Sequence, residues 1–316
     1  MTVGVIGAGA WGRSHVRTLQ EMGELAVVVE AHAPTREKVL ADFPGVPVVA
    51  DLAEALKGDA KAFVVATPAA THFDVATRIL TAGKDVLVEK PLTLSSAEGE
   101  RLVAAADAAG RVLMVGHLLL YDPGTAALAA ALRAGRIGEL RSVAIERLKL
   151  GRVRREEDVL WSFGVHDIAV MLDLVGAEPV RVDASGHAVL QPRVADDVHV
   201  HMTFPGDVRA HLHVSWLWPE TRRRTTLVGS KAMLTYDEVR REVRLHRRHV
   251  GADLKEADEG DEVLFSGEAQ PLRAELEHFL ACVRTRARPR SDGTQGVRVL
   301  RVLERAGAAM GGAHGA

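Results

Sequence analysis

The chain has 316 residues and a mass of 34.0 kDa, with 40 basic and 42 acidic side chains and a formal net charge of −2. At roughly 150 residues per domain, this length predicts two domains. The balanced charge argues against nucleic acid or an anionic membrane as a partner. The single cysteine, Cys282, cannot form an internal disulfide, and no signal-like or membrane-spanning apolar segment stands out, so a cytoplasmic protein is expected.

The first third of the chain alternates short apolar runs with helix-patterned segments. Strands are expected at Thr2–Ile6, Ala26–Glu30, Ala62–Ala66, Asp85–Val88 and Val112–Val115. Helices are expected at Gly12–Glu21, Thr35–Asp42, Leu52–Leu56, Thr71–Ala82 and Ser95–Ala109. Continuous apolar strands that alternate with helices are typical of a parallel sheet covered on both faces. Residues 1–120 are therefore predicted to form an α/β domain with a doubly wound parallel sheet.

After about Tyr121 the pattern changes to successive strands joined by short turns. Strands are expected at Leu140–Leu150, Val180–Leu190, Val198–Phe204, Val208–Trp216, Arg223–Val228 and Val243–Val250. Helices are expected at Gly124–Ala134, Val165–Leu174, Pro271–Arg286 and Thr294–Ala309. This order predicts a second, α+β domain with a mainly antiparallel sheet over residues 121–316. Its last helix is free to pack back on the first domain, and the triplet Arg222–Arg224 is interpreted as a solvated sheet edge.

Four histidines alternate with apolar residues on the two strands that flank a Pro-Gly-Asp turn. Because both apolar sets must lie on one face, the turn fixes a register with His199 opposite His213 and His201 opposite His211. Four imidazoles on one face could ligate zinc or copper. The alternative is a polar outer face or a subunit interface without metal. The alternative is favoured because no carboxylate or cysteine completes a recognisable ligand spacing, and no metal is assigned.

A G-x-G-x-x-G motif stands between the first expected strand and the first expected helix. Gly7 permits the tight turn, Gly9 lets the backbone approach a pyrophosphate, and Gly12 allows close packing of helix and strand. The pyrophosphate would lie at the helix N-terminus, where N–H groups are unpaired. The dinucleotide-binding residues predicted from this segment are Gly7, Gly9, Ala10, Trp11 and Gly12. The alternative is a glycine turn in a flavodoxin-like domain.

Glu30 ends the second expected strand, at the distance from the glycines where a dinucleotide fold carries an acidic residue. A carboxylate there accepts hydrogen bonds from the adenosine ribose and repels a 2′-phosphate, which favours NAD over NADP. His32 and Arg36 lie nearby in the sequence and could partly neutralise the negative charge of Glu30.

Two later strands of the first domain also end in polar segments. The first segment contains Thr67, Pro68 and His72, and the second contains Glu89, Lys90 and Pro91. Ligands of open α/β sheets bind at the carboxyl ends of the strands. A lysine at that edge could stabilise negative charge that develops on a substrate oxygen. The alternative is a solvated surface lysine.

Together the motifs resemble the Gfo/Idh/MocA family of NAD(P)-dependent oxidoreductases over nearly the full length of the chain. The motifs that carry the resemblance are Gly7–Gly12, Ala66-Thr67-Pro68 with His72, Ala82–Pro91 and Gly164-Val165-His166. The resemblance implies a Rossmann domain followed by an α+β domain with a large open sheet, through which such proteins form dimers or tetramers. It implies that Lys90 and His166 are the catalytic pair. It also implies that Glu89 and Pro91 shape the nicotinamide pocket, and that Thr67, Pro68 and His72 line the cofactor cleft.

Two features depart from the family pattern. Ser162 stands where many members carry an aspartate four residues before the catalytic histidine, and Asp167 is a possible substitute. The segment from His117 to Tyr121 replaces an Asn-x-Arg-type segment. Both His117 and Tyr121 could contact substrate, although an aromatic residue at a domain junction is more often packing.

A basic loop upstream of His166 resembles that of bacterial sugar-nucleotide dehydrogenases. Lys149, Arg152, Arg154 and Arg155 could bind a diphosphate, or they could pair with the acidic residues that follow them. The candidate substrate-binding residues are Lys90, His117, Tyr121, Lys149, Arg152, Ser162, His166 and Asp167. The function predicted is NAD-dependent hydride transfer between a nicotinamide and a hydroxyl carbon of a sugar or sugar nucleotide. The alternatives are a keto-sugar or imine reductase and a non-catalytic dinucleotide-binding regulator.

Overall fold

The computed structural model describes residues 2–251, 253–268 and 270–311. The contacts between these residues divide the chain into two units. The first unit joins residues 2–118 to residues 272–300, and the second joins the described part of residues 119–271 to residues 301–311. Each unit has its own β-sheet. The division into a cofactor domain and a substrate domain between residues 120 and 121 stays a prediction.

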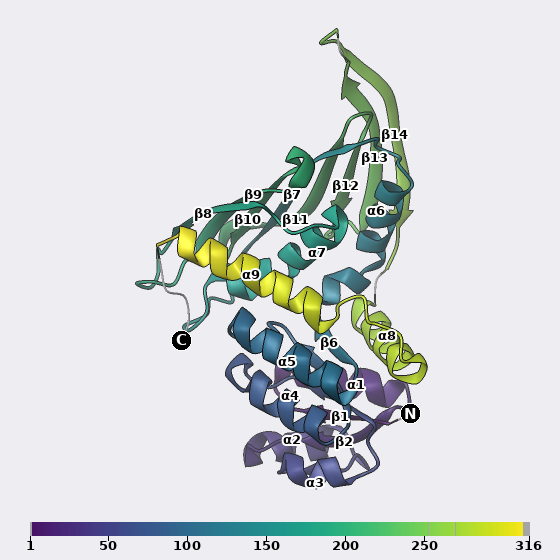
Figure 1. Cartoon of the computed structure of the whole chain (residues 1–316), viewed down its shortest axis with the longest axis vertical. Helices are drawn as coiled ribbons and strands as arrows, with labels where there is room; N and C mark the ends of the chain where they lie inside the picture. The colour runs from purple at the N-terminus through teal and green to yellow at the C-terminus, as the bar shows by residue number, and fades with distance from the viewer. Residues whose placement is uncertain (1, 252, 269, 312–316) are drawn as a thin grey trace. The chain divides into compact units, whose positions relative to one another are not determined.

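The first unit contains a parallel six-stranded sheet (Figure 1). Its strands are β1 (Val3–Ile6), β2 (Leu25–Val29), β3 (Val48–Val49), β4 (Ala62–Val65), β5 (Asp85–Glu89) and β6 (Leu113–Gly116). Their order is β3-β2-β1-β4-β5-β6. The chain adds β2 and β3 on one side of β1, and β4, β5 and β6 on the other side. Open α/β sheets bind ligands at such a switch point, which here lies between β1 and β4. Strand β3 was not predicted because two residues give no pattern.

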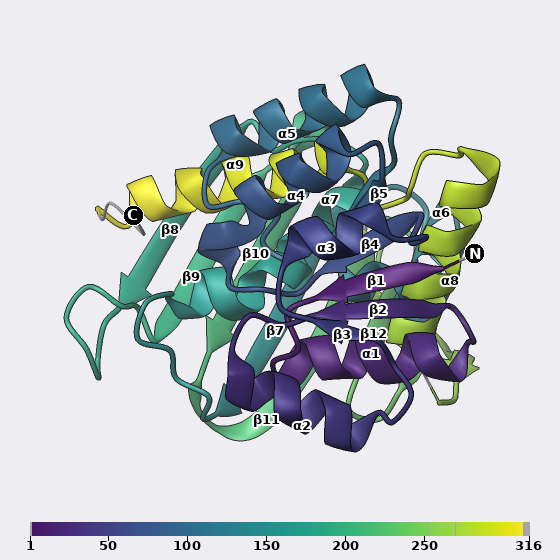
Figure 2. The same cartoon turned by 90° about the horizontal axis from the view of Figure 1, so that it is seen from below.

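Helices cover both faces of this sheet. Figure 2 shows α1 (Ala10–Glu21) and α2 (Ala33–Asp42) on one face, and α4 (His72–Thr81) and α5 (Ser96–Ala109) on the other. The connections also contain α3 (Leu52–Lys57) and the 3₁₀ turn η1 (Ala69–Thr71). Helix α8 (Pro271–Thr285) and the first half of α9 (Gly293–Ala309) return to this unit. Helix α9 approaches α5 so closely that a Cβ at Gly99 would lie 3.0 Å from Val297.

The second unit is built on a mainly antiparallel eight-stranded sheet in the order β14-β13-β12-β11-β7-β10-β9-β8. Its strands are β7 (Leu140–Leu150), β8 (Arg181–His187), β9 (Asp197–Thr203), β10 (Arg209–Ser215), β11 (Leu217–Gly229), β12 (Met233–Asp237), β13 (Glu242–Val250) and β14 (Glu256–Ser266). Strands β7 and β10 pair in parallel. The predicted fold class is therefore confirmed.

Parts of this sheet differ from the prediction. Strands β12 and β14 were not predicted. Strand β12 is too short to show the apolar alternation of a strand, and β14 is rich in carboxylates, which hide that alternation. The interpretation of Arg222–Arg224 as a sheet edge is wrong, because β11 lies between β12 and β7 inside the sheet. The registers of His199 with His213 and of His201 with His211 are confirmed on the two sides of the turn η4 (Pro205–Asp207).

Helices α6 (Pro123–Arg133) and α7 (Val165–Val175) pack on one face of the second sheet (Figure 1). The turn η2 (Leu118–Tyr121) precedes α6, and the π-helical turn η3 (Leu160–Gly164) runs into α7. Side chains of β9 and β10 that face these helices, such as Val200 and Leu212, are buried, whereas His199 and His211 on the other face are exposed. Among the helices that the structure describes, none has the length and apolarity needed to cross a bilayer.

Candidate active site

The glycine turn between β1 and α1 serves both the fold and a ligand. Gly7 has a φ of +85°, and a Cβ at Gly12 would lie 2.0 Å from the carbonyl oxygen of Gly7, so both positions require glycine for the fold. A Cβ at Gly9 would meet no atom of the described residues within 4 Å. Gly9 therefore leaves open space beside the first turn of α1, whose N–H groups are suited to bind a phosphate. These residues fit the pyrophosphate of a dinucleotide.

Glu30 is anchored to the same turn. Its Oε2 accepts a hydrogen bond from the backbone N–H of Ala8 at 2.8 Å, and its Oε1 accepts one from His32 at 2.9 Å. Each carboxylate oxygen has two lone pairs, so both can accept a further bond from a ribose hydroxyl. The neighbouring guanidinium of Arg36 donates to the backbone carbonyls of Glu30 and Ala31. The hydrogen bonds of Arg36 therefore go to backbone carbonyls and leave the carboxylate of Glu30 for other partners.

Glu89 ends β5 and connects that strand to α1. Its Oε1 accepts hydrogen bonds from Trp11 Nε1 and from His15 Nε2, each at 2.6 Å. Burial alone would raise the pKa of Glu89, but the hydrogen bonds and the charge of His15 hold this pKa below its ordinary value. Glu89 therefore stays ionised directly before Lys90. Trp11 and Glu89, two predicted cofactor residues, are thus bonded to each other.

His72 is buried and joins two segments at the carboxyl edge of the first sheet. Its Nδ1 lies 2.8 Å from the carbonyl oxygen of Pro91, and its Nε2 lies 2.9 Å from that of Thr67. The side chain of Thr67 also accepts a hydrogen bond from Thr71 at 2.7 Å, in the turn η1 that Pro68 precedes. His72 therefore positions the segments that follow β4 and β5. A direct contact of His72 with the cofactor stays a prediction.

Two further buried groups of the first unit interact electrostatically with Glu89. His117 is 1% exposed, and burial lowers its pKa to about 3, so its ring is neutral at physiological pH. Glu275 on α8 is fully buried, and neither carboxyl oxygen has a hydrogen-bond partner among the described residues. Burial, and then the charge of Glu89, raise the pKa of Glu275 well above its ordinary value. Sequence reasoning missed Glu275, although its position four residues before Phe279 lies on the apolar stripe of α8.

Glu275→Met is expected to stabilise the protein more at pH 8 than at pH 5. A carboxyl whose pKa is raised in the folded state must take up a proton on folding at any pH where the unfolded chain is ionised. The contribution of Glu275 to the free energy of unfolding therefore becomes more unfavourable as pH rises above about 4.3. Removing an unpartnered buried carboxyl should raise the free energy of unfolding at pH 8 by about 1–3 kcal/mol. Urea unfolding at both pH values measures this. The control is Glu277→Met at an exposed position of the same helix; equal destabilisation by Glu275→Met at both pH values would contradict the interpretation.

In the second unit, His166 lies in the first turn of α7, directly after the π-helical turn η3. The carboxylate of Asp158 accepts a hydrogen bond from the backbone N–H of Trp161 at 2.9 Å and so fixes the start of this turn. Ser162 is buried within it. Single π-helical turns are rare and often occur at functional sites. This local geometry is compatible with the catalytic role that the resemblance implies for His166.

Asp167 is held in an ion pair inside the second unit. Arg147 on β7 donates to both oxygens of Asp167 at 2.8–3.0 Å and also donates to Glu238 at 2.7 Å. Asp167 is 1% exposed. Burial opposes the charge on Arg147, but the two carboxylates outweigh burial and raise the pKa of the guanidinium above its ordinary value. This arrangement favours a structural role for Asp167, and its contact with substrate stays a prediction.

Part of the predicted basic loop forms a cluster of like charges. Burial lowers the pKa of Lys149, and the charges of Arg223 and Arg152 lower it further. Arg223 is half-buried, and its Nε has no hydrogen-bond partner among the residues that the structure describes. Arg154, in contrast, pairs with Glu157 at 3.4 Å. We call Lys149, Arg152 and Arg223 the basic cluster; sequence reasoning missed Arg223 because it was assigned to a sheet edge.

The predicted site residues thus form two groups, one in each unit. The first-unit group contains Gly7, Gly9, Ala10, Trp11, Gly12, Glu30, Thr67, Pro68, His72, Glu89, Lys90, Pro91 and His117. The second-unit group contains Tyr121, Lys149, Arg152, Ser162, His166 and Asp167. Within the first group, the hydrogen bonds connect α1 to the end of β5 and the end of β4 to the segment after β5. The action of Lys90 and His166 on one substrate stays a prediction.

Comparisons with known proteins agree with this division. Residues 1–117 match an oxidoreductase family with an NAD-binding Rossmann fold, and residues 125–235 match the GFO/IDH/MocA C-terminal domain. UDP-N-acetylglucosamine 3-dehydrogenase of Acidithiobacillus ferrooxidans is 31% identical over 95% of this chain and 94% of its own. Its solved structure has a TM-score of 0.89 at 29% identity and covers 98% of this chain and 97% of that chain. A solved protein of gentamicin A biosynthesis in complex with NAD has a TM-score of 0.84 at 25% identity, over 98% of this chain and 94% of that chain.

A Rossmann sheet with a glycine turn that fits a pyrophosphate, joined to a second sheet domain of this type, defines a dinucleotide-dependent oxidoreductase. The chain belongs to the Gfo/Idh/MocA family of oxidoreductases. The predicted family and the predicted enzyme class, a dehydrogenase acting on CH–OH groups, are confirmed. The predicted class of reaction, hydride transfer between a nicotinamide and a sugar hydroxyl carbon, agrees with these relatives as well.

Proposed function

We propose that this enzyme transfers a hydride between NAD and a hydroxyl carbon of a nucleotide-activated sugar. The observation that most supports this substrate class is the basic cluster of Lys149, Arg152 and Arg223, in the unit that also contains His166. Like charges repel one another, and a bound diphosphate would relieve this repulsion through charge-assisted hydrogen bonds. The relative from A. ferrooxidans is named for a substrate of this class.

NAD is the cofactor that we propose, in preference to NADP. Glu30 keeps free lone pairs for the ribose hydroxyls, and its negative charge would repel a 2′-phosphate. Arg36, which could have attracted that phosphate, donates to backbone carbonyls instead. The residues of the glycine turn would hold the pyrophosphate, and when bound the dinucleotide supplies the hydride acceptor or donor.

The proposed chemistry divides the work between two side chains. His166 removes the proton from the substrate hydroxyl, and the ammonium group of Lys90 donates a hydrogen bond to the same oxygen as negative charge develops on it. Glu89, which Trp11 and His15 keep ionised, supplies a fixed negative charge next to Lys90. In the reducing direction His166 returns the proton to this oxygen, and the ammonium group of Lys90 donates its hydrogen bond to the same oxygen.

We also propose that the enzyme is a cytoplasmic homo-oligomer. The half-buried side chains of Ala144, Val228 and Met233 lie on the face of the second sheet opposite α6 and α7, which suits them to contact a second copy. Cys282 is a free, buried thiol, which a reducing compartment preserves. Light scattering of the purified protein tests the proposed homo-oligomer, because the mass of a monomer would exclude it.

Thermal-shift titration tests the substrate and cofactor classes together. NAD and a UDP-sugar should each raise the melting temperature, because ligand at about 100 times its Kd adds about 2.7 kcal/mol of stability. Lys149→Met combined with Arg152→Met should abolish the shift caused by the UDP-sugar and keep the shift caused by NAD. The control is Arg154→Met, whose side chain pairs with Glu157. A larger shift with NADP than with NAD would contradict the cofactor, and a shift with free sugars alone would contradict the substrate class.

A further inference from the structure

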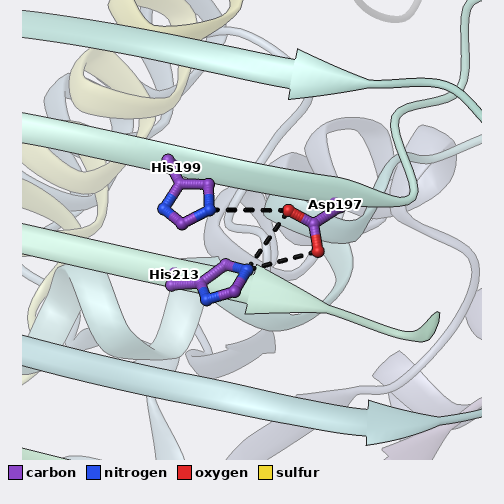
Figure 3. Close-up of side chains that lie close together, drawn as sticks. All are labelled: Asp197, His199 and His213. Carbon is purple, nitrogen blue, oxygen red and sulfur yellow. Dashed lines mark hydrogen bonds and ion pairs between the residues drawn. The ribbon is translucent and has the colours of Figure 1, made fainter. Parts of the chain in front are cut away.

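Three side chains outside the active-site groups converge on the exposed face of β9 and β10 (Figure 3). Asp197 and His199 lie two residues apart on β9, so both point to the same face of the sheet, and His213 is the partner of His199 on β10. The Nε2 atom of His213 lies 3.2 Å from both carboxylate oxygens of Asp197, and that of His199 lies 3.7 Å from Oδ1. One ligand atom from each residue lies within 4.8 Å of the others.

We infer that Asp197, His199 and His213 form a binding site for a divalent transition-metal ion of the zinc type. Two imidazoles and one carboxylate are ligands that zinc and its neighbours in the first transition row accept. Ligand atoms placed about 2.1 Å from a tetrahedral zinc ion lie roughly 3.4 Å from one another. The distances of 3.2 and 3.7 Å to Asp197 lie on either side of this value.

The sequence predicts a metal-free face because no carboxylate or cysteine completes a recognisable ligand spacing with the histidines. Asp197 provides a carboxylate. Because side chains alternate between the two faces of a strand, the spacing of two residues indicates that Asp197 shares a face with His199. Among the described residues, no carboxylate joins the neighbouring pair His201 and His211 in a cluster of three possible ligands. The Nδ1 atoms of that pair lie 2.8 Å apart. The three-residue cluster is therefore distinct from that pair.

Coordination requires one small rearrangement. The rings of His199 and His213 are stacked with centroids 3.8 Å apart and planes at 16°, so their nitrogen lone pairs are nearly parallel. A metal must lie close to the plane of each ring, so one ring has to turn. The side chain of His199 is 47% exposed and can rotate, whereas that of His213 is 15% exposed and makes a T-shaped ring contact with Trp218.

The test is a zinc titration of the full chain, purified without a histidine tag and stripped of metal. Isothermal titration and elemental analysis after dialysis should give one zinc ion per chain with a Kd of about 10 μM or below. His213→Gln and Asp197→Asn should each weaken this binding at least about 10-fold. Circular dichroism of each variant confirms that the sheet still forms.

Two controls decide whether the site is the one inferred. His249→Gln on β13 removes an imidazole from another strand and should leave zinc binding unchanged. His201→Gln should also leave it unchanged, because that residue belongs to the neighbouring pair. The inference is overturned if no stoichiometric zinc binds below millimolar concentration, or if binding survives His213→Gln and is lost with His201→Gln.

Discussion

Lys90→Met is expected to lower kcat/KM by about 100- to 10,000-fold on the best sugar nucleotide, while NAD still binds. Methionine keeps the length of the side chain but removes the ammonium group, so the substrate oxygen loses the partner that stabilises its developing charge. The loss should fall on kcat more than on KM, because the charge is greatest in the transition state. Steady-state kinetics and a binding titration with NADH measure the two effects separately.

Two variants make this prediction specific. His166→Ala should cause a loss of similar size, and the double variant should lose little more than the worse single variant, because the two groups are proposed to serve one step. Lys61→Met, an exposed lysine before β4, is the control and should keep its activity. If Lys90→Met and His166→Ala both retain near-normal kcat, the assignment of the catalytic pair is wrong.

The features that the sequence predicts well depend on neighbours along the chain. The glycine turn, Glu30 at the end of β2 and the buried parallel strands follow from turn geometry and from apolar runs, which are local properties. The register of β9 and β10 is a local property too, because a short turn joins two strands whose apolar sets must share a face. For the same reason the family motifs could be recognised before the fold was known.

Features that depend on packing between distant segments could not be predicted. Glu275 is buried because α8 returns to the first unit, and Arg223 is half-buried in β11, a strand that pairs on both sides. Arg147 can occupy a buried position of β7 because α7 places the carboxylate of Asp167, twenty residues further along the chain, within hydrogen-bond distance. A charged residue on the apolar side of a strand is the signal that such a partner exists, but it does not identify the partner.

Asp167→Ala is expected to cost about 3–5 kcal/mol of the free energy of unfolding, because it leaves the buried guanidinium of Arg147 with Glu238 alone. Urea unfolding followed by circular dichroism measures this loss. The control is Asp183→Ala, which removes a pair between Asp183 and Arg181 that is at least half exposed, and which should change stability by less than about 1 kcal/mol.

Asp167→Asn separates this structural role from the proton relay. Asparagine keeps the shape and one acceptor for Arg147, so it should destabilise less than alanine and leave the pH dependence of kcat where it is in the parent enzyme. If Asp167 instead orients His166 as the missing family aspartate would, Asp167→Asn should shift that pH profile and lower kcat about 100-fold without a matching loss of stability. That outcome would contradict the ion pair as the reason for an aspartate at this position. The geometry argues against it, because both oxygens of Asp167 accept hydrogen bonds from Arg147.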